Sequence, residues 1–416
     1  MKNVAVIGAG AAGLVSAYFA LENGAEVTLY ERNQQLGRKI CITGKGRCNL
    51  TNAVSARDFL EQVVHGGKFL SSALYRFDPY MTMEWFESLG LRLKVERGNR
   101  VFPASEKAGE VRDVLRRAVL EHRNCHLLRA RVKDVRVSEG RFSVVCESRT
   151  QEHDSVVLCT GGTSYPLTGS TGDGYVFAER LGHSVSQLYP SLVRVICEDP
   201  CCLDAQGVSL KNVRLSLYEE GTKKALYSQQ GELLFTDDGV SGPLVLSASA
   251  HLRGISGKTR FEINFKPALS REEVDARLLR DFAQNTNRNF KYALDDLLPA
   301  KMRPIFVRLS GISPDRKVHQ ITREERARLV GLFCAFPLKI RALGPMEEAI
   351  VTSGGVALSE IDPRTMESRI CPGLFFAGEV LDVDAYTGGF NLQIAFSTGR
   401  LAGECAARGM LQKNTK

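Results

Sequence analysis

Residues 4–31 read VAVIGAGAAGLVSAYFALENGAEVTLYE, a short apolar run that leads directly into a glycine-rich turn. The run Val4–Ile7 is apolar and mostly β-branched, which is typical of a strand buried in a parallel sheet. The pattern then predicts a helix over 14–23, closed by Gly24, and a second strand over 26–30. This order predicts a βαβ unit with G-x-G-x-x-G between its first strand and its helix.

Each part of the glycine-rich turn has a task in binding a dinucleotide. Gly8 permits the tight turn, Gly10 lets a pyrophosphate approach the backbone, and Gly13 lets the helix pack closely on the strand. The free N–H groups at the start of the helix, at Ala11 and Ala12, carry partial positive charge that favours phosphate. The unit therefore predicts a dinucleotide-binding domain.

Glu31 indicates which dinucleotide is bound. It ends the second strand, where a carboxylate can accept hydrogen bonds from ribose hydroxyls, so FAD or NAD is favoured over NADP. A glycine-rich basic stretch follows, as an extended FAD would require along its pyrophosphate and ribityl chain. The residues of this stretch expected to contact the cofactor are Arg32, Arg38, Lys39, Gly46, Arg47, Cys48 and Asn49. A solvated basic loop is the alternative interpretation of this stretch.

Two later glycine turns support the same site. A strand over 156–159 runs into Thr160, Gly161 and Gly162, and a strand over 373–377 runs into Gly378, Glu379 and Asp382. Because ligands of α/β sheets lie at the carboxyl ends of the strands, these turns are expected to converge with the first one. A last helix over 392–407 follows Gly388, Gly389 and Asn391, and it includes Gln393. Its N-terminus is expected to stabilise the N1–O2 edge of a reduced flavin.

Three segments carry a resemblance to a known family: GRKICITGKGRCNLTN over 37–52, TGGTSYP with STGDG over 160–174, and VTSGGV through TGGFNLQ over 351–393. Together they resemble the aminoacetone-oxidase and bile-acid-reductase-like (BaiN-type) flavoproteins, which have the glutathione-reductase-like FAD fold. The resemblance implies non-covalent FAD, with NAD(P)H as a possible electron donor. It implies either oxidation of a small amine by O₂ or reduction of an enone-type double bond. By position in related folds, Val132 is expected near the adenine. Asp237 stands where many members have a histidine, so no role is carried over to that position.

The expected fold class is α/β with α+β inserts: a Rossmann-like FAD-binding domain with an inserted β-barrel-like domain and a small helical subdomain. The FAD-binding domain is expected over 1–188 and 344–416, because nucleotide motifs lie at both ends of the chain. Short strands predict a β-barrel-like insert over 189–267 and 318–343. Between these, 268–317 is expected to form the helical subdomain, with helices over 270–284, 292–298 and 302–309; a further helix is predicted over 323–334.

The composition is that of an average globular protein. Of 416 residues, 44% are hydrophobic, and 55 Lys and Arg stand against 47 Asp and Glu, a net charge of +8. This mild excess is no nucleic-acid signature by itself, so the expected partner is a small-molecule substrate rather than nucleic acid. The eleven cysteines show no disulfide framework, and no signal peptide or membrane span is evident, so a cytoplasmic location is expected. No metal site is predicted, and the oligomeric state stays open.

Several other functions remain open. Cys41 and Cys48 could form the redox pair of a disulfide oxidoreductase, although six residues separate them and no second nucleotide-binding unit follows. An RNA-modifying flavoprotein, a fumarate-reductase-like flavoprotein and a non-catalytic flavin-binding regulator are further alternatives. No catalytic acid or base is identifiable from the sequence; Tyr165, Asp382 and Arg341 are neighbours worth testing.

Overall fold

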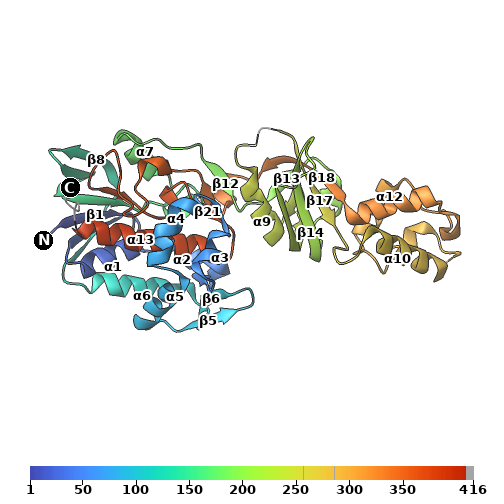
Figure 1. Ribbon diagram of the computed structural model, residues 1–416, viewed down its shortest axis with the longest axis horizontal. Helices are drawn as coiled ribbons and strands as arrows, with labels where there is room; N and C mark the ends of the chain where they lie inside the picture. Colours follow the sequence, from blue (N-terminus) through green and yellow to red (C-terminus); the bar gives the residue numbers. More distant parts are fainter. Residues whose placement is uncertain (256, 285, 409–416) are drawn as a thin grey trace. The chain divides into compact units, whose positions relative to one another are not determined.

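The computed structural model of the protein describes residues 1–255, 257–284 and 286–408. The chain forms two compact units (Figure 1): Met1–Ser191 with Met346–Lys416, and Leu192–Pro345. The second unit is thus inserted into the sequence of the first. The borders predicted from the sequence lie at 188 and 344.

A five-stranded parallel sheet forms the centre of the first unit. Its order is β20 (Leu374–Phe376), β11 (Ser155–Leu158), β1 (Asn3–Ile7), β2 (Glu26–Glu31) and β7 (Cys125–Arg129). Ala5 of β1 pairs with Val156 of β11 and with Thr28 of β2, and its side chain is fully buried. An apolar run without alternation is what a strand covered on both faces requires. The parallel order brings the carboxyl ends of β1, β2, β11 and β20 to one edge.

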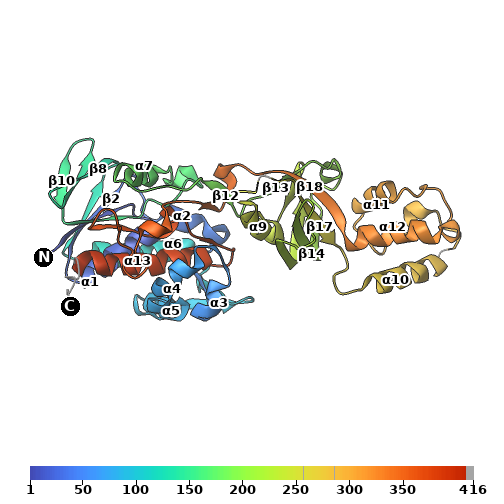
Figure 2. The same cartoon turned by 45° about the horizontal axis from the view of Figure 1, so that its top comes forward.

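Two helices from opposite ends of the chain lie side by side along this sheet, α1 (Ala11–Glu22) and α13 (Phe390–Arg408) (Figures 1 and 2). Small residues allow the close approach: a Cβ on Gly399 would lie 2.7 Å from the carbonyl oxygen of Ala12, and one on Gly403 would overlap that of Ser16. The C-terminal segment is therefore packed into the same core as the N-terminal βαβ unit.

Smaller elements complete the first unit. Its further helices are α2 (Arg38–Ile42), α3 (Ala56–Leu60), α4 (Gly67–Arg76), α5 (Pro79–Ser88), α6 (Ala108–Leu120) and α7 (Asp173–Arg180). Two antiparallel sheets contain β8 (Val132–Ser138), β9 (Arg141–Cys146) and β10 (Thr150–His153), and β3 (Thr51–Asn52), β6 (Arg100–Pro103) and β5 (Leu93–Glu96). Two strand pairs join β12 (Tyr189–Ser191) to β19 (Val351–Ser353), and β4 (Val63–His65) to β21 (Asp384–Ala385).

A closed barrel forms the sheet structure of the second unit. Its order is β13 (Val195–Cys197), β16 (Gly239–Ser241), β15 (Tyr227–Phe235), β14 (Ser209–Glu219), β17 (Thr259–Asn264) and β18 (Phe336–Leu343). Short helices α8 (Cys201–Asp204) and α9 (Pro243–Ser249) accompany it. Strand β15 is continuous over nine residues, Tyr227–Phe235. Gly231, in the interior of β15, has no side chain, and this leaves room for Leu244 of α9 to pack against the strand. The α/β class with an inserted barrel is confirmed.

Three helices of the second unit pack together, α10 (Arg271–Gln284), α11 (Met302–Ser310) and α12 (Arg323–Cys334). The helical part therefore extends beyond the predicted limit at 317, and within 318–343 only β18 belongs to the barrel. The helix predicted over 292–298 is wrong, because these residues form turns after a short 3-10 segment at Phe290–Tyr292. Side chains take the carbonyl groups there: Arg303 donates to Asp295 and Leu298, and Pro299 lacks the N–H that would continue a helix.

Candidate functional site

The turn between β1 and α1 has three glycines with different surroundings. Gly8 has φ +99°, and a Cβ on it would lie 2.6 Å from the carbonyl oxygen of Cys159. A Cβ on Gly13 would overlap the carbonyl oxygen of Gly8. A Cβ on Gly10, in contrast, would meet no atom within 4 Å. Gly8 and Gly13 are therefore required by packing, whereas Gly10 borders the open space at the N-terminus of α1, where a phosphate is favoured.

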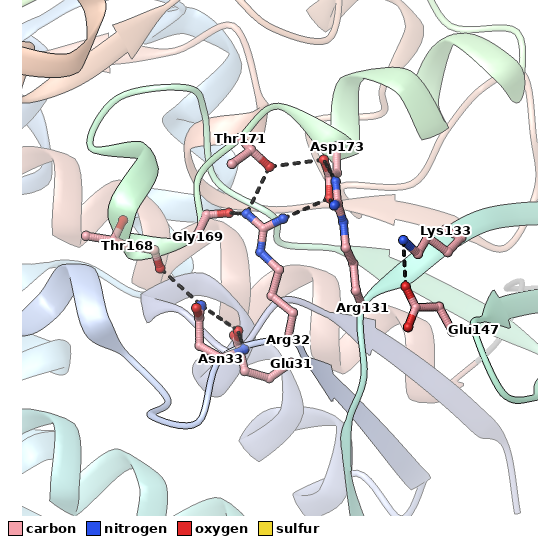
Figure 3. A network of polar contacts seen from close by, with 10 residues as sticks. All are labelled: Glu31, Arg32, Asn33, Arg131, Lys133, Glu147, Thr168, Gly169, Thr171 and Asp173. Atoms are coloured by element: carbon pink, nitrogen blue, oxygen red, sulfur yellow. Dashed lines mark hydrogen bonds and ion pairs between the residues drawn. The ribbon is translucent and has the colours of Figure 1, made fainter.

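The Glu31 carboxylate is fixed beside this turn by three hydrogen bonds. Its Oε2 accepts from the Ala9 backbone N–H at 3.0 Å. Its Oε1 accepts from the backbone N–H and side-chain amide of Asn33 at 2.7 and 2.8 Å, and Figure 3 shows Glu31 beside Asn33. A carboxylate has about four acceptor sites, so one stays available to a ribose hydroxyl. The position at the end of β2 is the one predicted from the sequence.

Arg32 is directed at the loop over 168–173 rather than at open space (Figure 3). Its guanidinium donates to the carbonyl of Gly169, to Thr171 Oγ1 at 2.9 Å and to Asp173 at 3.1 Å. Arg131 pairs with the same carboxylate at 3.0 Å. Burial opposes ionisation of Asp173, but hydrogen bonds from Arg131 and Thr171 with the two arginine charges outweigh it, so its pKa lies below the ordinary value. These contacts occupy the Arg32 side chain within the protein, and the predicted contact of Arg32 with the cofactor stays a prediction.

Three of the four cations in residues 38–47 have partners within the protein. Arg38 donates to Asn33 at 3.1 Å, Lys39 pairs with Glu379 at 2.7 Å, and Arg47 pairs with Glu96 while its guanidinium lies 4.2 Å from the ring centre of Phe102. Arg38 and Lys45 are exposed, so the alternative of a solvated basic loop fits those two side chains but not Lys39 and Arg47.

Cys48 is a buried thiol, and burial raises its pKa to about 12. It therefore stays protonated at neutral pH and is a poor nucleophile. Cys41 is half-buried, and both thiols are free. The backbone of Cys48 is left-handed, with φ 58°, as is that of Lys45 nearby. Non-glycine residues rarely adopt this conformation, and where it persists it often marks a ligand-binding turn.

Glu379 joins the three glycine turns at the edge of the sheet. Its carboxylate accepts from Lys39 Nζ at 2.7 Å, from Ser164 Oγ at 2.9 Å and from the Thr352 backbone N–H at 2.8 Å. A Cβ on Gly162 would overlap Thr352 Oγ1, and one on Gly378 would lie 2.8 Å from the Cβ of Ala12. The segments around Gly10, Gly161 and Gly378 are therefore held together, although they come from three distant parts of the sequence.

Three buried polar atoms in this region have no hydrogen-bond partner among the described residues: Thr160 Oγ1, Asn49 Oδ1 and Arg47 Nε. An unpaired buried polar atom costs about 1–3 kcal/mol, so such atoms are rare unless a ligand satisfies them. All three belong to residues that the sequence predicts to contact the cofactor. Together with the open space at Gly10 and the fixed carboxylate of Glu31, they fit a bound dinucleotide such as FAD.

The turn before α13 uses its side chains mainly for internal contacts. The Gly388 carbonyl accepts from Asn52 at 3.1 Å, and a Cβ on Gly389 would overlap the carbonyl of Thr51. The Asn391 amide bonds to the backbone of Ala385 at 3.0 and 2.8 Å, and Asp382 accepts from Ser186 at 2.8 Å.

Gln393 is fully buried, and its amide bonds to Thr51, Phe77, Thr82 and Ser397. The side chains of Gln393 and Asn391 are thus used for internal contacts, and their predicted contacts with the cofactor stay predictions. Val132 lies buried at the start of β8, where it pairs with Cys146. The structure leaves the predicted adenine contact of its backbone as a proposal.

One cluster at this edge is missed by the sequence reasoning. His65 of β4 and Asp384 of β21 are 319 residues apart, yet Nδ1 and Oδ1 lie 2.6 Å from each other. The carboxylate is fully buried and accepts also from Ser191 at 2.9 Å and from Ser353 at 3.0 Å. Neither residue stands in a recognisable motif, so only the pairing of β4 with β21 reveals the cluster.

The chain is similar to known proteins over nearly its whole length. The profile of the HI0933-like protein Rossmann domain matches residues 2–405. The chain belongs to this HI0933-like family. A 3-dehydro-bile acid Δ4,6-reductase of Clostridium scindens is 31% identical over 98% of this chain and 99% of the relative. A ribosomal RNA dihydrouridine synthase of Escherichia coli is 31% identical over 94% of this chain and 95% of that relative.

These relatives confirm the resemblance to bile-acid-reductase-like flavoproteins, and the HI0933-like chain is an FAD-dependent oxidoreductase. Among solved structures, the 3-ketosteroid Δ1-dehydrogenase of Sterolibacterium denitrificans has the same fold, with a TM-score of 0.51 and 12% identity over 98% of this chain and 100% of that one. Across the three described ranges, the helices are too short or too polar to cross a membrane.

Proposed function

We propose that this HI0933-like protein reduces a carbon–carbon double bond conjugated to a carbonyl group, with a reduced nicotinamide as electron donor. The observation that carries the proposal is that two relatives, each matched over nearly its full length, are named for different substrates but for the same type of reaction. The Δ4 and Δ6 double bonds of a 3-dehydro steroid are conjugated to the C3 carbonyl. The double bond that is lost on forming dihydrouridine is conjugated to the C4 carbonyl of uracil. The shared chemistry is addition of hydride and a proton across such a bond.

FAD, when bound, supplies the hydride at its N5 atom. The chain's own residues would bind and orient it: the N–H groups of Ala11 and Ala12 at the start of α1 would bind the pyrophosphate, and Glu31 would accept from the adenosine ribose. The N-terminus of α13 at Phe390 would contribute partial positive charge toward the N1–O2 edge. Thr160 and Asn49 have unused polar atoms with which to fix the cofactor.

The nicotinamide donor is proposed to bind transiently. The sequence contains one strand–GxGxxG–helix unit, which FAD would occupy, and no second unit of this kind that could bind a nicotinamide dinucleotide. Donor and acceptor would then use one binding space in turn. This predicts parallel lines in double-reciprocal plots of rate against donor at several acceptor concentrations.

Anaerobic stopped-flow absorbance with the purified FAD-loaded protein tests the proposal. We expect NADH or NADPH to bleach the flavin band, and a 4-en-3-one steroid or a uridine-containing RNA to restore it without oxygen. Fumarate and aminoacetone are the comparison compounds. Bleaching by aminoacetone alone, with recovery in air and release of peroxide, would indicate an amine oxidase. Recovery only with fumarate would indicate a fumarate-reductase-like enzyme, and either result would overturn the proposal.

Uracil within RNA is a second candidate substrate, because positive charge is concentrated in the second unit. That unit holds 24 Lys and Arg against 18 Asp and Glu, which is +6 of the chain's +8. Arg214 of β14 and Lys339 and Arg341 of β18 are exposed on the outer face of the barrel, with no ion pair among the described residues. Exposed unpaired cations can contact phosphates.

The dependence of RNA binding on salt distinguishes the two substrates. Affinity for ribosomal RNA fragments should fall steeply with salt, with a slope of about −3 in a plot of log affinity against log salt if these three cations each contact a phosphate. The R214Q/K339Q/R341Q variant should lose most of that slope. Affinity that is weak and independent of salt would leave the small molecule as the substrate.

A further inference from the structure

His65 has one ring nitrogen fixed and the other free. Nδ1 lies 2.6 Å from Asp384 Oδ1, while Nε2 has no hydrogen-bond partner among the described residues, and the side chain is 30% exposed. The partner carboxylate is fully buried and held in place by the hydroxyl groups of Ser191 and Ser353. A buried, hydrogen-bonded carboxylate that orients an imidazole through Nδ1 is the arrangement that leaves Nε2 directed for proton transfer.

The other histidines paired with a carboxylate differ in one essential respect each. His183 is buried, and both nitrogens are used, by Glu360 at 3.0 Å and Ser368 at 2.7 Å. His126 contacts Glu26 at 3.0 Å, but both side chains are about half exposed, at 58% and 47%. His153, which has no carboxylate, is buried with both nitrogens used by Tyr30 and Asn3. Among these four, only His65 combines a buried anchor with an accessible free nitrogen.

The cluster belongs to the same edge as the predicted cofactor site. Ser353, which donates to Asp384, follows Thr352, whose hydroxyl accepts from the Thr163 backbone N–H at 2.9 Å and whose own N–H donates to Glu379. In the other direction, Asp384 leads through the loop tied by Asn391 to the start of α13. His65 is thus connected to the turns assigned to FAD in two ways, through β19 by Ser353 and Thr352 and through β21 by Asp384 and Asn391.

We infer that His65 is the proton donor of the proposed reduction and that Asp384 is its positioning residue; this inference rests on the proposed function. When the β-carbon of the conjugated substrate receives hydride from reduced FAD, the α-carbon receives a proton from His65 Nε2. The two electrons come from the nicotinamide donor. The substrate double bond is reduced to a single bond. His65 is left neutral and regains a proton from water, while the Asp384 carboxylate is the counter-charge to the protonated ring.

Separate measurement of the two half-reactions tests this role. The variants are H65Q, which keeps an amide donor for Asp384, H65A, and D384N, with H126Q as a matched control that removes a surface histidine paired with a carboxylate. FAD content from the absorbance spectrum establishes that each variant binds the cofactor. Flavin reduction by NAD(P)H requires no proton for the substrate, so it should change less than about threefold in H65Q.

Flavin reoxidation by the conjugated acceptor should slow about 100-fold or more in H65Q and about tenfold in D384N, and should be unchanged in H126Q. Imidazole in solution should restore at least part of the rate to H65A but not to H65Q. The ¹⁵N NMR signals of the His65 ring should report a proton on Nδ1 in the wild type, with that preference lost in D384N. This last readout does not depend on activity.

The outcomes separate the two proposals. If wild-type protein transfers hydride to a conjugated acceptor and H65Q does so at the same rate, His65 is not the donor, while the function stands. A loss of rate without rescue of H65A by imidazole would also overturn the inference, because it would indicate a structural role. If the reduced wild-type protein is not reoxidised by any conjugated acceptor, the proposed function fails and the role of His65 fails with it.

Discussion

The two units differ in what defines their chemistry. In the first, close approach of the backbone defines the site: Cβ atoms on Gly8, Gly13 and Gly162 would collide with neighbouring atoms, whereas one on Gly10 would meet open space. In the second, the distinctive feature is side-chain charge on the outside of a barrel whose interior is apolar. A site built from backbone contacts tolerates few substitutions. A charged face, in contrast, tolerates the loss of a single charge, because the remaining charges still contribute to binding. Cofactor binding should therefore be sensitive to single changes, and partner choice to combined ones.

The largest expected effect is a difference in unfolding free energy between variants at two glycines of the same turn. Gly13→Ala places a methyl group on the Gly8 carbonyl oxygen, so the first unit should lose about 3 kcal/mol of unfolding free energy and bind little FAD. Gly10→Ala meets no protein atom, so it should fold normally and still lose FAD. Urea denaturation with absorbance of bound flavin measures both. Equal stability of the two variants would contradict the packing argument.

The next effect is on the dependence of the unfolding free energy on pH. Burial lowers the pKa of His153 to about 4, from about 6.5 when unfolded, so the unfolded chain binds the extra proton between these values. Stability is therefore complete above pH 6.5 and falls with decreasing pH, by about 2 kcal/mol at pH 5. In His153→Gln, the unfolding free energy should change less between pH 7 and pH 5. The exposed His126→Gln is the control and should keep the wild-type slope.

A smaller effect is expected at the ribose end of the cofactor. Glu31→Gln keeps one acceptor oxygen but replaces a charged acceptor by a neutral one, so the affinity for FAD should fall about tenfold. Titration of the apoprotein with FAD by fluorescence quenching gives the dissociation constant. An Asp173→Asn variant, which loosens the loop over 168–173 without touching Glu31, provides the comparison. Unchanged affinity in Glu31→Gln would remove Glu31 from the site.

The smallest effect on the protein itself should come from the outer face of the barrel. The R214Q/K339Q/R341Q variant changes exposed side chains, so its unfolding free energy should stay within about 0.5 kcal/mol and its FAD content should be unchanged. Salt-dependent RNA binding is the only property expected to decrease. A loss of FAD would mean that the two units do not divide their chemistry in this way.

The sequence predicts the first unit better than the second. The segment from Gly8 to Glu31 is local, so its spacing alone predicts the strand, turn and helix that the structure contains. In the barrel, the bounds of β16 and β18 are not predicted, because β16 makes only two-residue pairings and β18 pairs with strands that are distant in the sequence. The helix over 323–334 is predicted with its bounds, since Thr322 and Glu325 form a capping box.

The candidate site divides in the same way. Turn glycines are recognisable because steric demand leaves one residue type, whereas the protein contacts of the Arg32 and Gln393 side chains are not predicted from the sequence. Their side chains find protein partners at Asp173 and Thr82, which are far away in the sequence. The pair of His65 and Asp384 is invisible for the opposite reason, since a contact over 319 residues leaves no local pattern.

Because the second unit is inserted into the sequence of the first, the two units are completed at different times during translation. The barrel and its helices are contiguous, so everything they need has left the ribosome once Pro345 has emerged. The enclosing unit then still lacks β20 at the edge of its sheet and α13, which packs along α1. We therefore expect the barrel unit to fold first during translation, and the site for FAD to form only after the last helix is synthesised.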